Sequence, residues 1–136
     1  EQLGVVPRAV RELFARIDKL RTAADAAEDA TEGTQFSVKV SCLQIYKERV
    51  YDLLNPVAAV AQFGSRSEEI GQGLRLRWDT LQGRFTVENL FEYECGCADD
   101  VMKHYAIGVQ NKQVASTAMN AASSRSHTML LITLTR

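Results

Sequence analysis

The sequence has no apolar stretch long enough to cross a membrane and no secretory signal. None of its apolar runs approaches the roughly 18 residues that a membrane-spanning helix needs, and the first residues lack the parts of a signal peptide. Charge of one sign is not in excess either, because 16 basic and 17 acidic residues give a net charge of −1. We therefore expect no membrane span and no nucleic-acid partner attracted by a global basic field.

Cysteine is scarce as well, and the chain does not start with methionine. Cys42, Cys95 and Cys97 are odd in number and fit no common metal spacing, so we interpret them as reduced cysteines of an intracellular protein. A helical pattern begins almost directly after Glu1, and Arg136 follows an apolar run without a break. We expect the 136 residues to form one domain, or part of one, cut from a longer protein.

Hydrophobic periodicity predicts an α/β domain with helices packed around a central sheet. The last apolar run, "TMLLITL", is nearly continuous, which is typical of a strand in a sheet covered on both faces. Val101, Tyr105 and Val109 form the predicted inner stripe of the second helix. The expected elements are a helix at 5–22, a strand at 35–46, a helical turn within 47–55, a loop at 57–73, a hairpin at 74–90, a helix at 98–113 and a strand at 128–135.

The predicted hairpin carries basic residues on one face. Apolar and basic residues alternate in residues 74–78, which places Arg75 and Arg77 opposite the side of Trp78, and Arg84 follows the turn. Such a face is either solvated without a partner or attractive to an acidic partner surface.

A serine-rich stretch stands directly before the last strand. Asparagine and serine supply short, neutral hydrogen-bonding groups, and a hydroxyl can ligate Mg²⁺. Such groups can also hold a terminal phosphate or its attacking water, because phosphoryl transfer depends on positioning and charge neutralisation. A solvated capping loop would have the same composition. The polar residues are Asn120, Ser123, Ser124, Arg125, Ser126 and His127.

Residues 120–127 read N-x-x-S-S-R-S-H, which resembles the switch I signature of the kinesin motor domain. Myosins share only the N-x-x-S-S-R part. Further segments resemble the same family in the same order, and the resemblance covers the chain except residues 22–34 and 57–73. They are "GVVPRAVRELF" (4–14), "VKVSCLQIYKERVYDLLNP" (38–56), "LRLRWDT…FTVENL" (74–90) and "VQNKQVASTAMNAASSRSH" (109–127).

The resemblance implies a three-layer, P-loop NTPase-like kinesin motor fold with a mixed central sheet, present here in part, with switch I at 116–127. The 136 residues contain no G-x-x-x-x-G-K-[ST] and no D-x-x-G. The parent protein is then expected to be a microtubule-stimulated ATPase that moves along microtubules, whereas this chain alone is expected to bind ATP weakly or not at all.

The resemblance also implies roles for single residues towards ATP and Mg²⁺. Ser124 would approach Mg²⁺, and Ser123 and Asn120 would approach the γ-phosphate and the attacking water. Arg125 would form a salt bridge to a switch II glutamate, and Ser126 completes the expected nucleotide-binding set.

The hairpin of a kinesin contacts tubulin, chiefly β-tubulin, so the resemblance assigns Arg75, Arg77 and Arg84 to microtubule binding. It implies a cytoplasmic, cytoskeletal location, including spindle or cilium, and any homodimer would form through regions outside this chain. The alternative is a non-motile, kinesin-derived domain that binds microtubules or axonemes structurally, or a pseudo-motor. Gln44 departs from the family, which commonly has glutamate there, and Trp78 replaces a usual acid.

Overall fold

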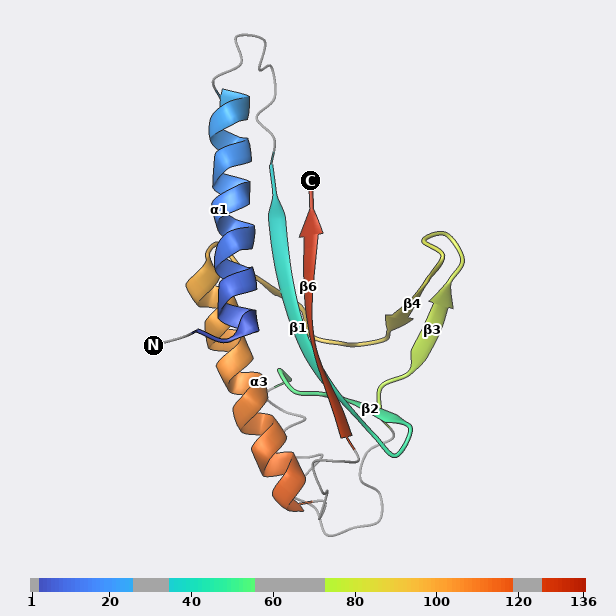
Figure 1. Cartoon of the computed structure of the whole chain (residues 1–136). Coiled ribbons are helices and arrows are strands. Elements are labelled where there is room, and N and C mark those ends of the chain that lie inside the picture. Colours follow the sequence, from blue (N-terminus) through green and yellow to red (C-terminus); the bar gives the residue numbers. More distant parts are fainter. Residues whose placement is uncertain (1–2, 26–34, 56–72, 119–125) are drawn as a thin grey trace.

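The computed structural model describes residues 3–25, 35–55, 73–118 and 126–136 (Figure 1). The predicted loop at 57–73 therefore lies outside the described residues except for its last position. The elements are α1 (Val5–Asp25), β1 (Ser37–Tyr46), β2 (Arg49–Asp52), β3 (Leu76–Asp79), β4 (Arg84–Val87), β5 (Tyr93–Glu94), α3 (Ala98–Ala118) and β6 (Ser126–Thr135).

The ten-residue strand β1 is the centre of the described sheet. It pairs with β2 along one part of its length, with the short β5 at Lys39 and Val40, and with β6 along its whole length. The β1–β6 register runs from Ser37 opposite Thr135 to Tyr46 opposite Ser126. All of these pairings are antiparallel, so the described strands supply only the antiparallel part of the predicted mixed sheet.

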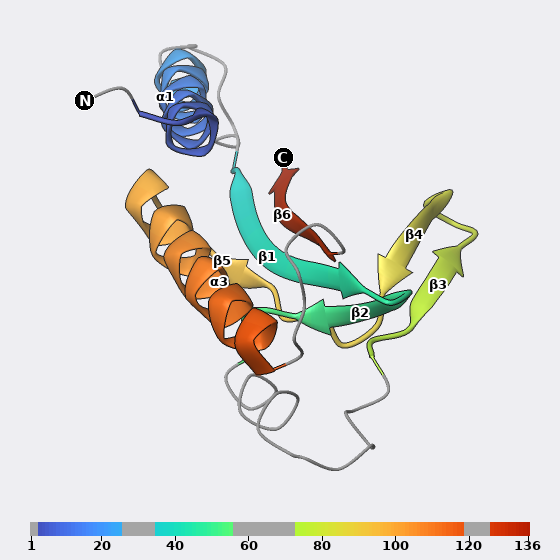
Figure 2. The same cartoon turned by 60° about the horizontal axis from the view of Figure 1, so that its bottom comes forward.

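The two helices that the structure describes, α1 and α3, lie on one face of this sheet (Figures 1 and 2). Successive strand residues point to opposite faces, and Val38 and Val40 of β1 turn towards the helices. They form a buried cluster with Val10 and Ile17 of α1 and Val101 of α3. Burying each such side chain contributes roughly 1.5–3 kcal/mol, so this cluster is what holds the two helices against β1.

The contact between α3 and β1 depends on a missing side chain. A Cβ atom added at Gly108 would lie 2.7 Å from the Cys42 sulfur, closer than such atoms approach in proteins. The predicted inner stripe of this helix was partly wrong, because Val101 is fully buried whereas Val109 is exposed. The helix turns its glycine, one position earlier, towards the sheet, and this close approach directs Val109 to the side.

Residues 47–55 do not form the predicted helical turn. Lys47 and Glu48 make a two-residue turn with φ angles of 47° and 61°, and residues 49–52 return as β2. Two-residue hairpin turns with positive φ at both positions match the twist of the flanking strands. The prediction failed because glycine and asparagine, which usually mark such a turn, are not present here.

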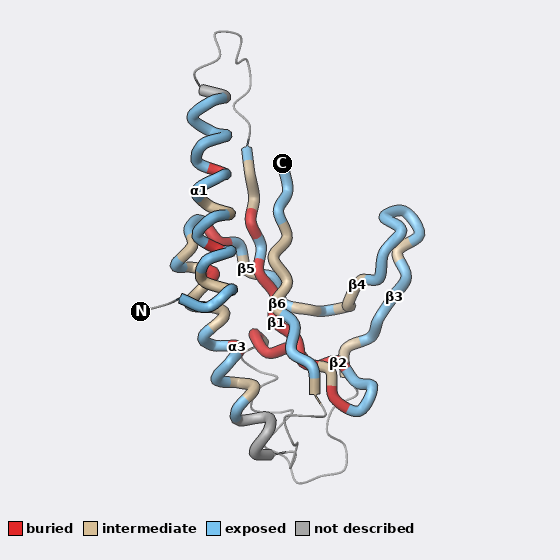
Figure 3. The backbone as a smooth tube through the Cα atoms, in the orientation of Figure 1, coloured by how far each residue is buried: buried red, intermediate tan, exposed pale blue. Residues whose placement is uncertain are grey.

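Strand β6 is less covered than its apolar run predicted. Leu130 and Ile132 pack against the helix side of the sheet, but Met129 and Leu134 are 47% and 46% exposed. Among the described strands β6 pairs only with β1, and its residues are all exposed or half-buried (Figure 3). The expectation that both faces of this strand are covered was therefore wrong for the described part of the chain.

The hairpin of β3 and β4 forms a separate two-stranded sheet that stands away from the main sheet (Figures 1 and 2). The segment that enters β3 is attached to β2, because the Leu74 backbone N–H donates to the Val50 carbonyl at 2.8 Å. Gly73 allows this approach, since a Cβ there would lie 2.7 Å from the same carbonyl oxygen. The hairpin is thus anchored at its base and exposed beyond it.

Candidate functional site

Four of the predicted nucleotide-site residues lie outside the described part of the chain. They are Asn120, Ser123, Ser124 and Arg125. The described flanks of the predicted stretch 116–127 are the last turn of α3, which ends at Ala118, and the start of β6 at Ser126. Both flanks lie at the end of the sheet where β1 meets β2 (Figure 1).

Ser126 is the predicted nucleotide-site residue whose placement is described. It is the first residue of β6 and lies opposite Tyr46, the last residue of β1. Its Oγ atom is buried and has no hydrogen-bond partner among the described residues. His127 follows opposite Ile45 and is exposed, so it presents its ring to solvent.

A buried carboxylate lies at the same end of the sheet. Asp52 at the end of β2 is fully buried and accepts the backbone N–H groups of Leu54 at 2.7 Å, Asn55 at 3.2 Å and Phe91 at 2.7 Å. Burial raises the pKa of Asp52, and the three N–H donors offset part of this rise. The residue was not singled out from sequence, although a carboxylate inside an apolar "VYDLL" run was a usable signal.

The nearby Cys42 thiol is not a reactive group. Burial, together with the Asp52 charge, raises the pKa of Cys42 to about 11. A thiol reacts as its thiolate, so this side chain stays protonated at neutral pH and serves as a packing residue under Gly108.

The basic face of the hairpin contains three arginines and two carboxylates. The register places Arg75, Arg77 and Arg84 on the same side as Asp79 and Glu88. Arg77 forms an ion pair with Glu88, and Asp79 accepts two backbone N–H groups of the turn, at 2.9 and 3.1 Å. Arg75 and Arg84 are exposed, so they are the arginines of this face with the most freedom to meet an acidic surface.

The opposite face of the hairpin is apolar and also exposed. Trp78 and Phe85 are cross-strand neighbours with ring centroids 4.9 Å apart in an edge-to-face arrangement, and they are 54% and 68% exposed. An open groove of about 320 Å³ separates β4 from the second face of the main sheet, with Phe85, Val87 and Leu131 among its lining residues. Trp78 and Phe85 thus pack on each other and still leave much of both side chains in solvent.

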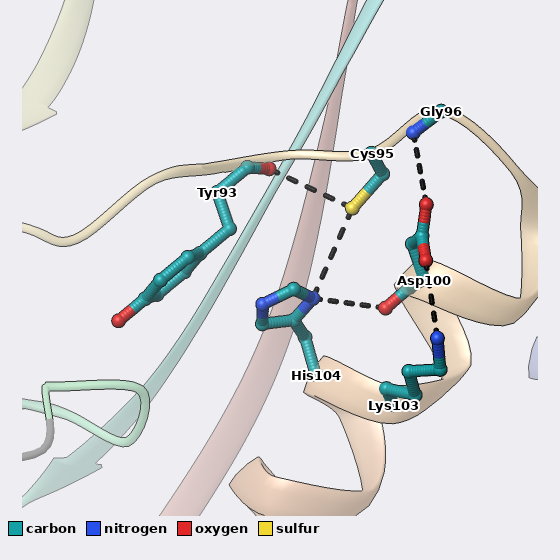
Figure 4. A network of polar contacts seen from close by, with 6 residues as sticks. All are labelled: Tyr93, Cys95, Gly96, Asp100, Lys103 and His104. Atoms are coloured by element: carbon teal, nitrogen blue, oxygen red, sulfur yellow. Dashed lines mark hydrogen bonds and ion pairs between the residues drawn. The ribbon is translucent and has the colours of Figure 1, made fainter.

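A polar network fixes the segment between β5 and α3 (Figure 4). The His104 Nδ1 atom lies 2.8 Å from the Asp100 carbonyl oxygen, and since that oxygen can only accept, Nδ1 carries the proton. The ring stacks on Tyr93 with centroids 4.5 Å apart. The Cys95 sulfur lies 3.9 Å from the same nitrogen, and burial raises the pKa of Cys95.

The carboxylate of Asp100 completes this network at the first turn of α3. It accepts the Gly96 N–H at 3.2 Å and lies 3.4 Å from the Lys103 ammonium (Figure 4). A hydrogen bond from the Cys97 thiol is the largest of the effects that lower the pKa of Asp100. A negative charge at this position complements the helix dipole, so the network orders the start of α3.

The described residues contain no group of three or more His, Cys, Asp and Glu side chains that could hold a metal ion. All three cysteines are free. No helix in the described ranges is long and apolar enough to span a membrane.

The sequence matches a known family along its whole length. A family model described as the kinesin motor domain matches residues 1–136. The chain is 36% identical over 136 residues to Kinesin-like protein KIP2 of Eremothecium gossypii, covering 100% of this chain and 18% of that protein. It is 34% identical over 134 residues to Kinesin-related protein 5 of Dictyostelium discoideum, covering 98% of this chain and 11% of that protein.

The fold matches as well. A solved structure of a fast kinesin superposes with a TM-score of 0.72 at 29% identity, over 96% of this chain and 30% of that one. The chain thus spans less than a third of the length of these relatives. The comparison confirms the predicted kinesin motor fold, of which these residues form a part. By both its sequence and its fold, the chain belongs to the kinesin motor domain family.

Proposed function

We propose that this chain is a segment of a microtubule-based motor that hydrolyses ATP, and that its stretch 116–127 senses the nucleotide. The observation that carries the proposal is the family match over residues 1–136 together with the complete N-x-x-S-S-R-S-H motif at 120–127. The ends of the stretch are attached to α3 and to β6, two elements packed against the same strand, β1. A change in the stretch can therefore be transmitted to the sheet.

The donor set of the stretch fits ATP and Mg²⁺. Serine hydroxyls and the asparagine amide are neutral oxygen-bearing groups that suit a hard cation and phosphate oxygens. Ser124 would hold Mg²⁺, with Ser123 and Asn120 towards the γ-phosphate and its attacking water, and Ser126 at the base of the set. When bound, Mg-ATP supplies the terminal phosphoryl group that is transferred to water. Arg125 would pair with a carboxylate elsewhere in the motor and hold the loop closed.

The hairpin is proposed as a microtubule contact of this motor. Arg75 and Arg84 are exposed and would attract an acidic tubulin surface, chiefly on β-tubulin. Arg77 is already paired with Glu88 and would contribute less. Such a contact would place the protein on the cytoskeleton, with spindle and cilium both compatible.

The Arg125→Ala variant of the intact protein tests the nucleotide-sensing role. Without the guanidinium the loop loses its latch but keeps its oxygen ligands, so we expect microtubule-stimulated ATP turnover to collapse while ATP affinity changes little. The Arg11→Ala variant, on the exposed side of α1, is the matched control and is expected to leave turnover unchanged. Persistent turnover in Arg125→Ala would show that the latch role is wrong. Microtubule binding by a wild-type protein without turnover would favour the non-motile alternative.

A further inference from the structure

The end of β1 contains a buried polar side chain without a hydrogen bond. Gln44 is fully buried, and among the residues that the structure describes neither its Nε2 nor its Oε1 has a partner. Its neighbours across the sheet are Tyr51 on β2 and Thr128 on β6. Leaving a donor and an acceptor unpaired in the protein interior is strongly unfavourable, so this amide requires a partner.

A second unpaired polar atom projects from the same face of the sheet. The Ser126 Oγ is buried and unpaired within the described ranges. The register pairs Tyr46 with Ser126 and Gln44 with Thr128, so Gln44 and Ser126 are diagonal neighbours on one face. Such neighbours have their backbones roughly 7–8 Å apart, a separation that a glutamine side chain and one small molecule can span.

The surroundings specify what can lie between the two groups. This face is closed by Tyr46 of β1 and Tyr51 of β2, which are 6% and 3% exposed, and by Cys42 under Gly108, whereas Thr128 on the β6 side is exposed. The register places Asp52 on the opposite face, so it brings no carboxylate here that would favour a cation. An amide and a hydroxyl each donate and accept. A water molecule is small and neutral and can both donate and accept hydrogen bonds, so it fits between the Gln44 amide and the Ser126 hydroxyl.

We propose that Gln44 and Ser126 bind one ordered water molecule between β1 and β6, and that this water fixes the first residue of β6. Gln44 then acts as a positioning residue for the point where stretch 116–127 joins the sheet. The second statement rests on the proposed function of that stretch, whereas the water site itself does not. A glutamine suits the position because its amide is neutral and can be buried beside a water molecule without the cost of burying a charge.

Hydrogen exchange in the intact protein tests the water site through a double-mutant cycle. Gln44→Leu and Ser126→Ala each remove one side of the bridge, so each is expected to lower the protection of the first β6 amides roughly fivefold or more. The double variant should be no worse than either single variant. Gln110→Leu, an exposed position on α3, is the control and should change nothing. Additive effects, or higher protection in Gln44→Leu, would overturn the bridge.

A crystal structure of the wild-type protein supplies a test that requires no variant to fold. The proposal expects a water within about 3.2 Å of both the Gln44 amide and the Ser126 Oγ. A direct hydrogen bond between the two side chains, or a dry gap, would overturn it.

ATP turnover of the same variants tests the positioning role separately. Gln44→Leu is expected to raise the KM for ATP several-fold while kcat stays within about twofold, because the ligands remain but are held less firmly. An unchanged KM overturns the positioning role. If the wild-type protein shows no ATP turnover, the proposed function is overturned instead. The double-mutant cycle measured by hydrogen exchange then still tests the water site.

Discussion

The Asp52 carboxylate accepts the Phe91 backbone N–H at 2.7 Å, across 39 residues of sequence. This bond connects the end of β2 to the segment that leaves the β3–β4 hairpin. The segment that enters the hairpin is held to β2 by the bridge between Val50 and Leu74. Both ends of the exposed hairpin are thus attached to one short strand of the main sheet.

Replacing Asp52 should destabilise the fold strongly. Asp52→Ala removes the carboxylate that accepts the N–H groups of Leu54 and Phe91 at 2.7 Å and of Asn55 at 3.2 Å. The Leu54 N–H is the buried donor of the three, whereas those of Asn55 and Phe91 are part-buried. Because one unpaired buried group costs about 1–3 kcal/mol, we expect the free energy of unfolding to fall by about 2–3 kcal/mol in urea denaturation. Asp79→Ala removes a similar turn bond on the exposed hairpin and should cost about 1 kcal/mol at most. Equal losses would contradict the burial argument.

The same carboxyl should give a defined pH dependence. Burial raises the pKa of Asp52 above its ordinary 3.8, so the folded state binds this proton more tightly than the unfolded state. Its contribution to stability is then largest at low pH, falls as the pH rises from about 4 through the folded pKa, and is constant above that. The difference in unfolding free energy between wild type and Asp52→Asn, measured over a pH series, should show this fall. A rise with pH would mean that the three N–H donors outweigh burial.

The β1–β2 turn stores conformational strain that can be removed. Lys47 and Glu48 both have positive φ, which costs residues other than glycine and asparagine roughly 1 kcal/mol each. Lys47→Asn with Glu48→Gly should therefore raise the free energy of unfolding by about 1–2 kcal/mol, seen as a higher midpoint in thermal denaturation. Gly83→Ala, at φ 61° in the other hairpin, is the reverse experiment and should destabilise. No gain from the double change would show that the turn is unstrained.

The hairpin arginines should differ in their effect on microtubule binding. Arg75 and Arg84 are exposed, whereas Arg77 is paired with Glu88. In co-sedimentation of the intact protein we expect Arg75→Ala and Arg84→Ala to weaken binding several-fold at low salt and less at high salt, since exposed charges are screened. Arg77→Ala should have the smallest effect. If Arg77→Ala weakened binding most, this would contradict the view that the ion pair with Glu88 keeps Arg77 from tubulin.

Periodic patterns predicted the elements that are governed by one-sided burial. The helix at 5–22 appears as Val5–Asp25, and the strand at 35–46 appears as Ser37–Tyr46, because each buries one face against the other. The β1–β2 turn was the element predicted least well, since Lys47 and Glu48 are not residues that usually mark a turn. Burial was overestimated for β6, because an apolar run records what a strand can bury and not how many neighbours it has in the described chain.

The candidate site was predictable as a motif but not as an arrangement. The serine-rich motif was recognisable in the sequence, and Ser126 is placed at the base of β6. The importance of Gln44 and Asp52 depends on complete burial, which is set by the pairing of β1 with β2 and β6. A local sequence pattern does not encode which polar residues such pairing encloses.

Steady-state ATP turnover of the intact wild-type protein with and without microtubules tests the proposed motor function most directly. We expect slow turnover alone and a large increase, on the order of tenfold or more, when microtubules are added. Turnover that is absent, or that does not respond to microtubules, would contradict the claim that residues 116–127 serve a microtubule-stimulated motor.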